Sequence, residues 1–266
     1  MWFGEYGNHA LGHIVGATGE YTSHHVPDAL GSHAPAIPFM DAHGIVFVAD
    51  HEGNMMLRFD PATSAFEAFP IPTAGSWPVG IGQAADANVV FVAETYAHKV
   101  AVFDTSTRAF TEYDLSTNGG TAFFTVAADS ASLWFSLWSQ QGFLKFDIAT
   151  HETTEYTIND GTDARLGPTT RLPDGRIAFG GLANGRVYLF DPANESLVYV
   201  DGIGTLKDGM TARGESEIWV SEMGTVLDRI DWNGAVAADA GTDSASADAA
   251  VDAGSDGGPV ADAGQD

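Results

Sequence analysis

A unit of about 44 residues recurs along residues 2–232, and this period limits the possible folds more than any other feature of the sequence. In each copy, an apolar run such as Val89 to Ala93 ends at a landmark position, and successive landmarks are 45, 44, 43, 44 and 41 residues apart. A second landmark, usually Phe followed by Asp, keeps the same spacing. The first landmark is occupied by Glu5, Asp50, Glu94, Leu137, Gly181 and Glu222. The second is occupied by Phe59-Asp60, Phe103-Asp104, Phe146-Asp147, Phe190-Asp191 and Ile230-Asp231. Two independent markers with one period indicate a repeat architecture.

The residues between the landmarks predict short strands joined by tight turns. From Val89 to Leu115, runs of β-branched and aromatic residues alternate with polar residues, as in consecutive strands. The polar turns open with Asp60, Asp104 and Asp147, and an Asp carboxylate closes such turns by accepting backbone N–H groups. Four short strands in a period of this length are typical of a propeller blade, so we predict an all-β propeller of four-stranded blades.

The predicted propeller occupies residues 1–234, and a segment of different composition follows it. Unit one lacks a first strand and unit six lacks a fourth, so we expect about six units of a ring whose N-terminal portion, at least one strand, is missing. Residues 235–266 are rich in Ala, Asp, Gly and Ser and contain no aromatic residue, so we expect a disordered acidic tail. The units lie near residues 1–30, 31–72, 73–117, 118–160, 161–202 and 203–234.

The charge of the chain narrows the choice of partners. There are 36 acidic residues against 11 Lys and Arg, which gives a net charge of −25. Phosphate backbones and anionic bilayers repel such a surface, so we predict that nucleic acid is not a partner. No run of about 18 apolar residues occurs, which predicts no transmembrane segment. The absence of cysteine excludes disulfides and thiolate chemistry.

Several motifs inside the unit carry a resemblance to a known family. They are Trp2-Phe3-Gly4-Glu5, Gly19-Glu20-Tyr21, Pro35-Ala36-Ile37, Asp50-His51-Glu52-Gly53-Asn54, Pro78-Val79-Gly80-Ile81 and Phe110-Thr111-Glu112-Tyr113. Over residues 2–232 the unit resembles that of virginiamycin B lyases, also called streptogramin lyases. The resemblance implies a seven-bladed propeller that opens the ester-closed ring of type B streptogramins by elimination, with Mg²⁺ as cofactor.

The catalytic residues that this resemblance implies are not matched. The family's chemistry depends on Pro-His-x-Ile motifs in the first strands of two neighbouring blades, together with nearby Glu residues. None of the five equivalent positions holds a side chain that takes a proton near neutral pH. These positions are Ala36, Val79, Ala122, Thr169 and Gly209. No catalytic residue carries over, and a shared fold does not transfer an activity.

Acidic residues occupy the first landmark in four units: Glu5, Asp50, Glu94 and Glu222. In one interpretation, they surround the mouth of the axial channel and attract a cation or a cationic ligand. In the other, they accept backbone N–H groups and fix the loop that follows each strand. Carboxylate oxygens suit hard cations, so Asp50 and Glu94 are candidate ligands for Mg²⁺ or Ca²⁺.

Histidine supplies the remaining candidate chemistry. His51, between Asp50 and Glu52, is our candidate catalytic residue, because a neutral imidazole can act as a base or ligate a metal. The alternative is a loop histidine exposed to water. His9 and His98 share one repeat position with Asn54, which favours a role in the turn, and His33 has no partner at a recognised ligand spacing.

Three functions fit these observations. The absence of the family's catalytic histidines favours a propeller that binds a ligand or partner, or an enzyme of unknown substrate. The first alternative is a Mg²⁺-dependent carbon–oxygen lyase that linearises type B streptogramins and so confers antibiotic resistance. The second is a Ca²⁺-dependent hydrolase of the gluconolactonase type, for which Glu94 is available as a ligand, whereas the Asn residues lie in predicted turns. We expect a monomer that binds a small molecule or peptide and that is secreted or held in the envelope of a bacterium.

Overall fold

The residues described in our computed structural model form six antiparallel sheets, which confirms the predicted all-β propeller. Each sheet consists of strands that follow one another in sequence; the first and last have three strands and the others have four. The predicted tail at 235–266 lies outside the described residues. The structure describes residues 1–31, 33–83, 88–115, 123–129, 131–205, 207–214, 216–222 and 227–232.

The bounds of the elements follow the repeat. The first three sheets contain β1 (Trp2–Glu5), β2 (Ala10–Ile14) and β3 (Tyr21–His25); β4 (Pro35–Met40), β5 (Val46–Asp50), β6 (Met55–Asp60) and β7 (Ala65–Pro70); β8 (Pro78–Gln83), β9 (Val89–Glu94), β10 (Lys99–Asp104) and β11 (Ala109–Asp114). The last three contain β12 (Phe123–Ala128), β13 (Ser132–Leu137), β14 (Gly142–Asp147) and β15 (Thr153–Thr157); β16 (Leu166–Arg171), β17 (Ile177–Gly181), β18 (Val187–Asp191) and β19 (Ser196–Val200); β20 (Lys207–Arg213), β21 (Glu217–Glu222) and β22 (Leu227–Asp231). The 3-10 helices η1 (Tyr6–Asn8) and η2 (Asp28–Leu30) lie in loops. No described helix is long and apolar enough to cross a bilayer.

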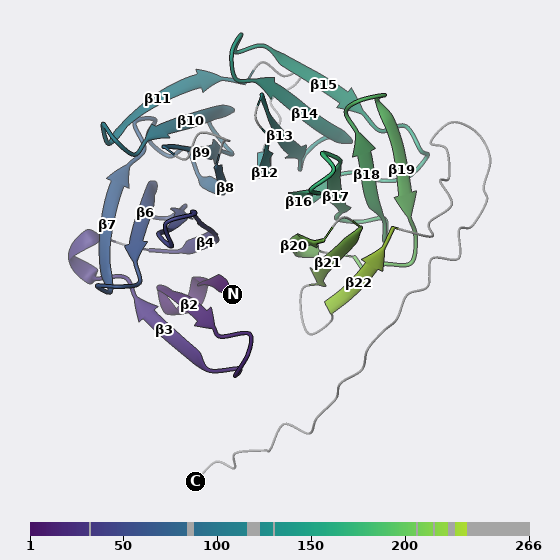
Figure 1. Ribbon diagram of the computed structural model, residues 1–266. Helices are drawn as coiled ribbons and strands as arrows, with labels where there is room; N and C mark the ends of the chain where they lie inside the picture. The colour runs from purple at the N-terminus through teal and green to yellow at the C-terminus, as the bar shows by residue number, and fades with distance from the viewer. Residues whose placement is uncertain are drawn as a thin grey trace.

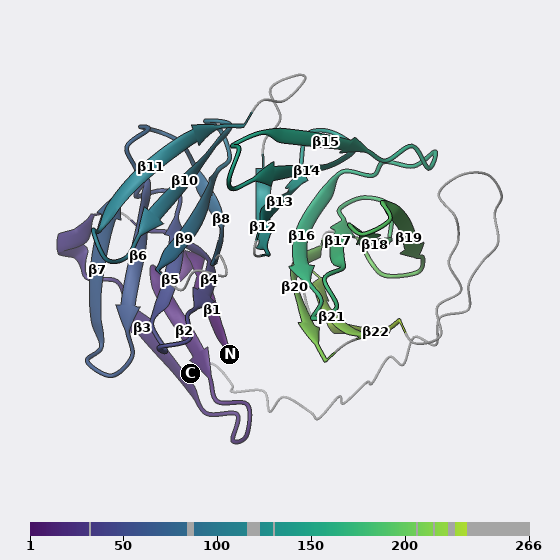
Figure 2. The same cartoon turned by 45° about the horizontal axis from the view of Figure 1, so that its top comes forward.

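The sheets are arranged as blades around a common centre (Figure 1). The first strands β4, β8, β12, β16 and β20 lie on the inner side, where neighbours contact one another. In the first blade, β1 contacts β4. The outer positions are taken by β7, β11, β15 and β19, and Figure 2 shows the inner strands from a second angle. Within the described residues, the first and last sheets share no strand.

The apolar core lies between blades rather than inside any one of them. In β9, Val90 and Val92 pack with Phe47 of the second blade, whereas Phe91 packs with Phe135 of the fourth. Side chains alternate between the two faces of a strand, so one central strand contributes to two interfaces. Both faces of a blade are therefore apolar, and polar side chains are restricted mainly to strand ends and loops.

The turns have the predicted Asp residues and a repeated backbone strain. Asp60 accepts the backbone N–H of Ala62, and Asp104 accepts those of Ser106 and Thr107. The last residue of each of these turns has a positive φ, which a non-glycine residue adopts at some cost. These residues are Ser64, Arg108, His151 and Glu195. His9, Asn54 and His98 share a second left-handed position, with φ of 51°, 51° and 54°, as their common turn role predicts.

A close approach of backbones joins the first blade to the second. A Cβ atom at Gly4 of β1 would lie less than 3.0 Å from the carbonyl oxygens of Pro35 and Ala36, closer than real Cβ atoms come. Glycine at this position therefore lets β1 sit directly against β4, and this contact places the landmark acid Glu5 beside the second blade.

Replacing Gly4 by Ala should lower the free energy of unfolding by about 2 kcal/mol or more, because the clash is with backbone atoms that cannot rotate away. Urea denaturation measures the change. Gly7→Ala is the control, because a Cβ there meets nothing within 4 Å. Equal stability of the two variants would show that β1 and β4 are not in close contact.

Candidate functional site

The landmark acids lie at one end of their sheets, which we call the landmark end. Asp50 closes β5 opposite Pro35, and Glu94 closes β9 opposite Pro78. The first strand of each blade enters at this end from the preceding inter-blade loop. The first strands of the second to sixth blades each have a register shift near this end, a bulge of the kind that redirects side chains. Loop, bulge and landmark residue therefore meet at one place in each blade.

Asp50 is fully buried and has a complete set of partners. Its Oδ1 accepts the N–H of Ala34 at 2.9 Å and that of Gly53 at 3.0 Å, and its Oδ2 lies 2.5 Å from Nδ1 of His33. The bond from Gly53 fixes the turn after β5, and the other two hold the loop before β4. Asp50 thus stabilises two loops from a buried position, and its predicted place at the mouth of the axial channel stays a prediction.

Glu5 holds the equivalent position in the first blade but has side-chain partners. It accepts hydrogen bonds from the hydroxyls of Tyr21 at 2.8 Å and Ser23 at 3.1 Å, and from Nδ2 of Asn8 at 3.2 Å. Partial burial acts to raise the pKa of Glu5, but these hydrogen bonds outweigh it, so the pKa lies below its ordinary value. Glu5 is therefore an ionised anchor for β3. Glu222 ends β21, and its side chain lies outside the described residues.

Glu94 differs from both, because it is fully buried and neither carboxylate oxygen has a hydrogen-bond partner. Burial raises the pKa of Glu94 to about 7, and the negative charge of Glu112 adds to the shift, while the positive charge of Lys99 opposes it. Buried polar groups without partners are rare in native proteins, and a bound ligand or water is a common reason for them. Of the three described landmark acids, Glu94 alone has free coordinating atoms.

The neighbours of Glu94 are bound to one another. Lys99 donates to Thr73 Oγ1 at 3.0 Å and to Glu112 Oε2 at 3.4 Å, and Glu112 also accepts the N–H of Thr73 at 2.8 Å. Asn54 accepts the N–H of Ser76 at 2.7 Å. These bonds tie the loop between the second and third blades to both blades. They leave Glu94 beside a cation that is already paired.

Next to these acids, four aromatic rings from three blades form a line that we call the aromatic row: Tyr6, His51, Trp77 and Tyr96. The centroids of successive rings are 5.0, 4.5 and 5.3 Å apart. Tyr6, Trp77 and Tyr96 are 54%, 37% and 53% exposed. Adjacent exposed aromatic side chains are typical of binding surfaces.

Trp77 is held in a strained backbone conformation within the aromatic row. Its φ is 54°, a left-handed value that a bulky side chain rarely adopts and that costs on the order of 1–3 kcal/mol. Its carbonyl accepts the N–H of Thr95 at 3.2 Å, and the carbonyl of Ser76 accepts that of Tyr96 at 3.0 Å. The surrounding bonds therefore hold a strained residue so that its ring lies partly in solvent.

His51 lies between Tyr6 and Trp77 and is buried, so the expectation of a water-exposed loop histidine is wrong. The reason is the aromatic row itself, whose rings cover the imidazole. Burial lowers the pKa of His51, and the charges of Asp50 and Glu52 oppose the shift. Its Nδ1 is buried without a hydrogen-bond partner.

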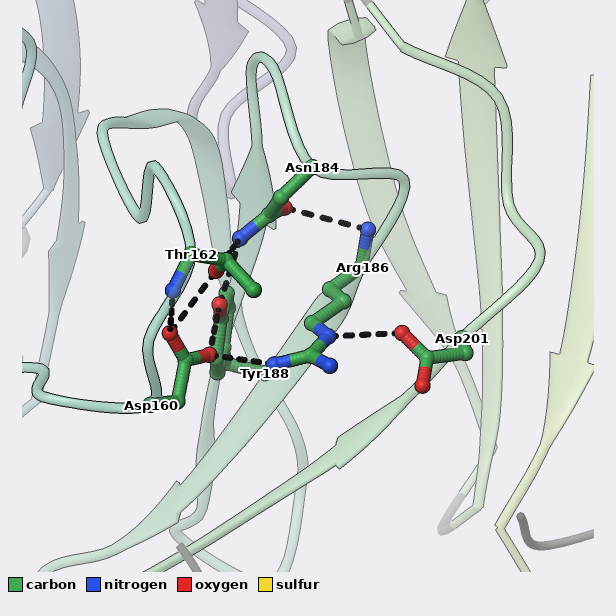
Figure 3. A network of polar contacts seen from close by, with 6 residues as sticks. All are labelled: Asp160, Thr162, Asn184, Arg186, Tyr188 and Asp201. Atoms are coloured by element: carbon green, nitrogen blue, oxygen red, sulfur yellow. Dashed lines mark hydrogen bonds and ion pairs between the residues drawn. The ribbon is translucent and has the colours of Figure 1, made fainter. Parts of the chain in front are cut away.

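A second polar network, in the fifth blade, is complete (Figure 3). Asp160 accepts hydrogen bonds from Arg186 at 2.6 Å and from Tyr188 at 2.5 Å, and Arg186 also binds Asp201 at 2.6 Å. Asn184 donates to Thr162 and to Tyr188, so this asparagine is engaged in the network. Because its groups satisfy one another, we assign this network to holding the loop against its blade.

A metal site is not assembled from the predicted ligands. Among the residues that the structure describes, no three His, Asp or Glu side chains gather closely enough to hold a metal ion. Ligation of Mg²⁺ or Ca²⁺ by Asp50 and Glu94 stays a prediction. The two carboxylates differ in their availability to a metal ion. Both oxygens of Asp50 accept hydrogen bonds, whereas neither oxygen of Glu94 has a hydrogen-bond partner.

Sequence reasoning missed Trp77 and His33, both of which lie in inter-blade loops. These loops differ in length and composition, so the repeat gives no alignment for them. One signal was present: each residue lies one or two positions before the proline that opens a first strand, Pro78 and Pro35 respectively. The equivalent of the family's histidine position in the fourth blade, Ala122, lies outside the described residues.

No protein-family model and no curated protein matches the sequence. The fold, in contrast, is similar to solved structures. A virginiamycin B lyase from Staphylococcus aureus superposes with a TM-score of 0.75 at 16% identity, over 87% of this chain and 77% of that one. A streptogramin B lyase gives 0.74 at 19% identity, over 87% and 76%. Hydrazine synthase from Kuenenia stuttgartiensis gives 0.67 at 15% identity, over 85% and 71%. These similarities show the propeller fold, which proteins of unlike chemistry share.

Glu94 makes a testable contribution to the pH dependence of stability. Its pKa is about 7 in the folded protein and about 4.5 in the unfolded chain, so only the folded state keeps the proton between these values. The free energy of unfolding should therefore fall by roughly 3 kcal/mol as the pH rises from 4.5 to above 7.

Glu94→Gln should remove this fall, because the amide carries no charge at either pH. Urea denaturation of wild type and variant at pH 4.5 and pH 8 should show the variant gaining about 2–3 kcal/mol relative to wild type at the higher pH. Exposed Glu152→Gln controls for the change in net charge. If the free energies of unfolding of Glu94→Gln and Glu152→Gln change with pH in the same way, the pKa of Glu94 is not raised in the folded protein.

Proposed function

We propose that this chain is a binding propeller, and that a positively charged small molecule or peptide binds at its landmark end against the aromatic row. The observation that carries the proposal is the row itself, with three exposed rings and a strained Trp77 kept in place by surrounding hydrogen bonds. Solvent-exposed apolar rings and backbone strain each cost stability, and their coincidence is typical of functional surfaces.

Electrostatics supports a cationic ligand. The faces of Tyr and Trp rings attract cations, with about 0.5–2 kcal/mol for each favourable contact. The chain carries a net charge of −25, and Glu52 and Asp50 lie beside His51 in the row. An anionic ligand would be repelled from this surface, whereas a cation is attracted over a long range and held by the rings at short range.

A binding role without catalysis agrees with the side chains found at the positions where the lyase family has its catalytic histidines. Ala36, Val79, Thr169 and Gly209 supply neither a base nor an acid, and Thr169 donates its hydroxyl to the carbonyl of Ala178. Within this proposal, His51 supports the rings of Tyr6 and Trp77, between which it packs.

Binding can be measured with choline as probe and 3,3-dimethylbutan-1-ol, its neutral isostere, as comparison. Isothermal titration should show choline binding at least about fivefold more tightly than the alcohol, since only choline can make cation–π contacts. Trp77→Ala should weaken choline binding by a similar factor. Met40→Ala, which removes an exposed side chain at the opposite end of the second blade, should leave it unchanged.

Equal affinity for choline and the alcohol would contradict the cationic ligand. Undiminished binding by Trp77→Ala would contradict the position of the site. Circular dichroism of Trp77→Ala at the titration temperature confirms that any loss of binding occurs in a folded protein.

The runner-up function is a Mg²⁺-dependent streptogramin lyase, and the similarity of fold to solved lyases favours it over other enzymes. If this function holds, a type B streptogramin incubated with the protein and Mg²⁺ should give a linear product of unchanged mass, because elimination adds no water. Chromatography with fragmentation distinguishes that product from the cyclic substrate and from a hydrolysis product. On the binding proposal, no product forms at micromolar protein over a day.

A further inference from the structure

Exposed aromatic rings gather at the landmark end of the protein. Among the described residues, five Tyr or Trp side chains are exposed, and four of them lie at this end: Tyr6, Trp77, Tyr96 and Trp138. The fifth, Tyr21, begins β3 opposite Ile14, at the other end of the first blade. Trp138 is 41% exposed and is not a member of the aromatic row. The aromatic surface at the landmark end is therefore larger than the row.

One repeat position supplies most of these rings. In four consecutive blades, an aromatic residue follows the landmark position by one or two residues: Tyr6 after Glu5, His51 after Asp50, Tyr96 after Glu94, and Trp138 after Leu137. In the fifth blade, the residues after Gly181 are Leu182 and Ala183. Equivalent turns of successive blades lie at the same end of a propeller, so these rings follow the blades in order.

The turns that carry Tyr96 and Trp138 belong to adjacent blades, as the positions of β9 and β13 show (Figure 1). Ala93 lies three residues before Tyr96, and Leu137 directly precedes Trp138. Ala93 and Leu137 belong to one apolar cluster in the interface between the third and fourth blades. Trp138 therefore extends into the fourth blade a series of rings that begins with Tyr6 in the first.

A single small cation cannot contact all of these rings. A cation is attracted to a ring whose centroid lies within about 6 Å of it. Successive centroids in the aromatic row are 5.0, 4.5 and 5.3 Å apart, so one cation reaches two or three neighbouring rings. Tyr6 and Trp138 lie in the first and fourth blades. Only a ligand that extends across several blades contacts both of them.

The charges at the landmark end favour a ligand with several positive groups. Glu52 and Asp114 are exposed there. Described basic side chains at this end are paired with acids: Lys99 with Glu112, Arg165 with Asp163, and Arg186 with Asp160. A ligand that approaches this end of a chain with a net charge of −25 therefore meets negative charge.

We propose, on the basis of the binding role proposed above, that the ligand is an extended peptide with several Lys or Arg side chains, which crosses the landmark end from the first blade to the fourth. Its cationic side chains stack on the rings of the aromatic row, and Trp138 is its outermost contact. Each cation–π contact is weak alone, but contacts joined on one chain bind far more tightly together than singly. Roughly five extended residues, at about 3.3 Å each, span the row, and a longer peptide extends beyond it.

The experiment is isothermal titration of the full-length protein with choline and with N-acetylated, C-amidated tetralysine and octalysine. A salt concentration of about 0.15 M screens most of the long-range attraction between the acidic protein and the peptides. Octalysine should bind about tenfold or more tightly than tetralysine. Trp138→Ala should weaken octalysine binding by about fivefold and leave choline binding unchanged, because choline contacts only the aromatic row.

Trp138→Phe is the matched variant. It keeps an aromatic face at this position, so it should recover most of the affinity for octalysine that Trp138→Ala loses. Neither variant changes the net charge, so a difference between them cannot come from unspecific attraction between protein and peptide. Met40→Ala, at the opposite end of the second blade, should bind octalysine as wild type does.

The extended peptide is overturned if octalysine binds no more tightly than tetralysine, or if Trp138→Ala binds octalysine as tightly as wild type. In both cases, choline binding that Trp77→Ala weakens leaves the site of the proposed function in place. If wild type binds neither choline nor octalysine, the proposed function fails as well. Tighter binding of neutral chitohexaose than of octalysine would assign the rings to a glycan and overturn the peptide, because sugar rings also stack on aromatic side chains.

Discussion

Apolar packing between neighbouring blades is the interaction on which the rest of the structure depends. A single blade cannot bury its own faces, so each central strand supplies side chains to two interfaces, as Val92 and Phe91 do in β9. Full burial of such side chains stabilises the fold by about 1.5–3 kcal/mol each. Because both faces of a blade are buried by this packing, the side chains that can bind a ligand lie at the strand ends and in the loops between blades.

At the landmark end, one repeat position has three different environments. The carboxylate of Asp50 accepts hydrogen bonds from two backbone N–H groups and contacts a histidine, and that of Glu5 accepts three from side-chain donors. The carboxylate of Glu94 accepts none. The strands that present these acids are equivalent, so the difference comes from the loops beside them. The blades of a repeat fold therefore share one backbone framework, while the polar residues at the strand ends can differ from blade to blade.

The proposed binding site follows the same logic. The aromatic row combines side chains from three blades, so it does not lie within one repeat unit. Solved propellers of low sequence identity share the framework, and their names cover different activities, so function must be argued from these junctions.

The sequence by itself determined the repeat, the strands, the turn-closing Asp residues and the turn position shared by His9, Asn54 and His98. Each of these depends on local backbone geometry or on side-chain alternation, which neighbouring residues encode. Only the tertiary structure decided which landmark acids have partners, that His51 is buried, and that His33 meets Asp50. Those outcomes depend on contacts between blades and irregular loops, and the repeat period carries no information about where such loops fold.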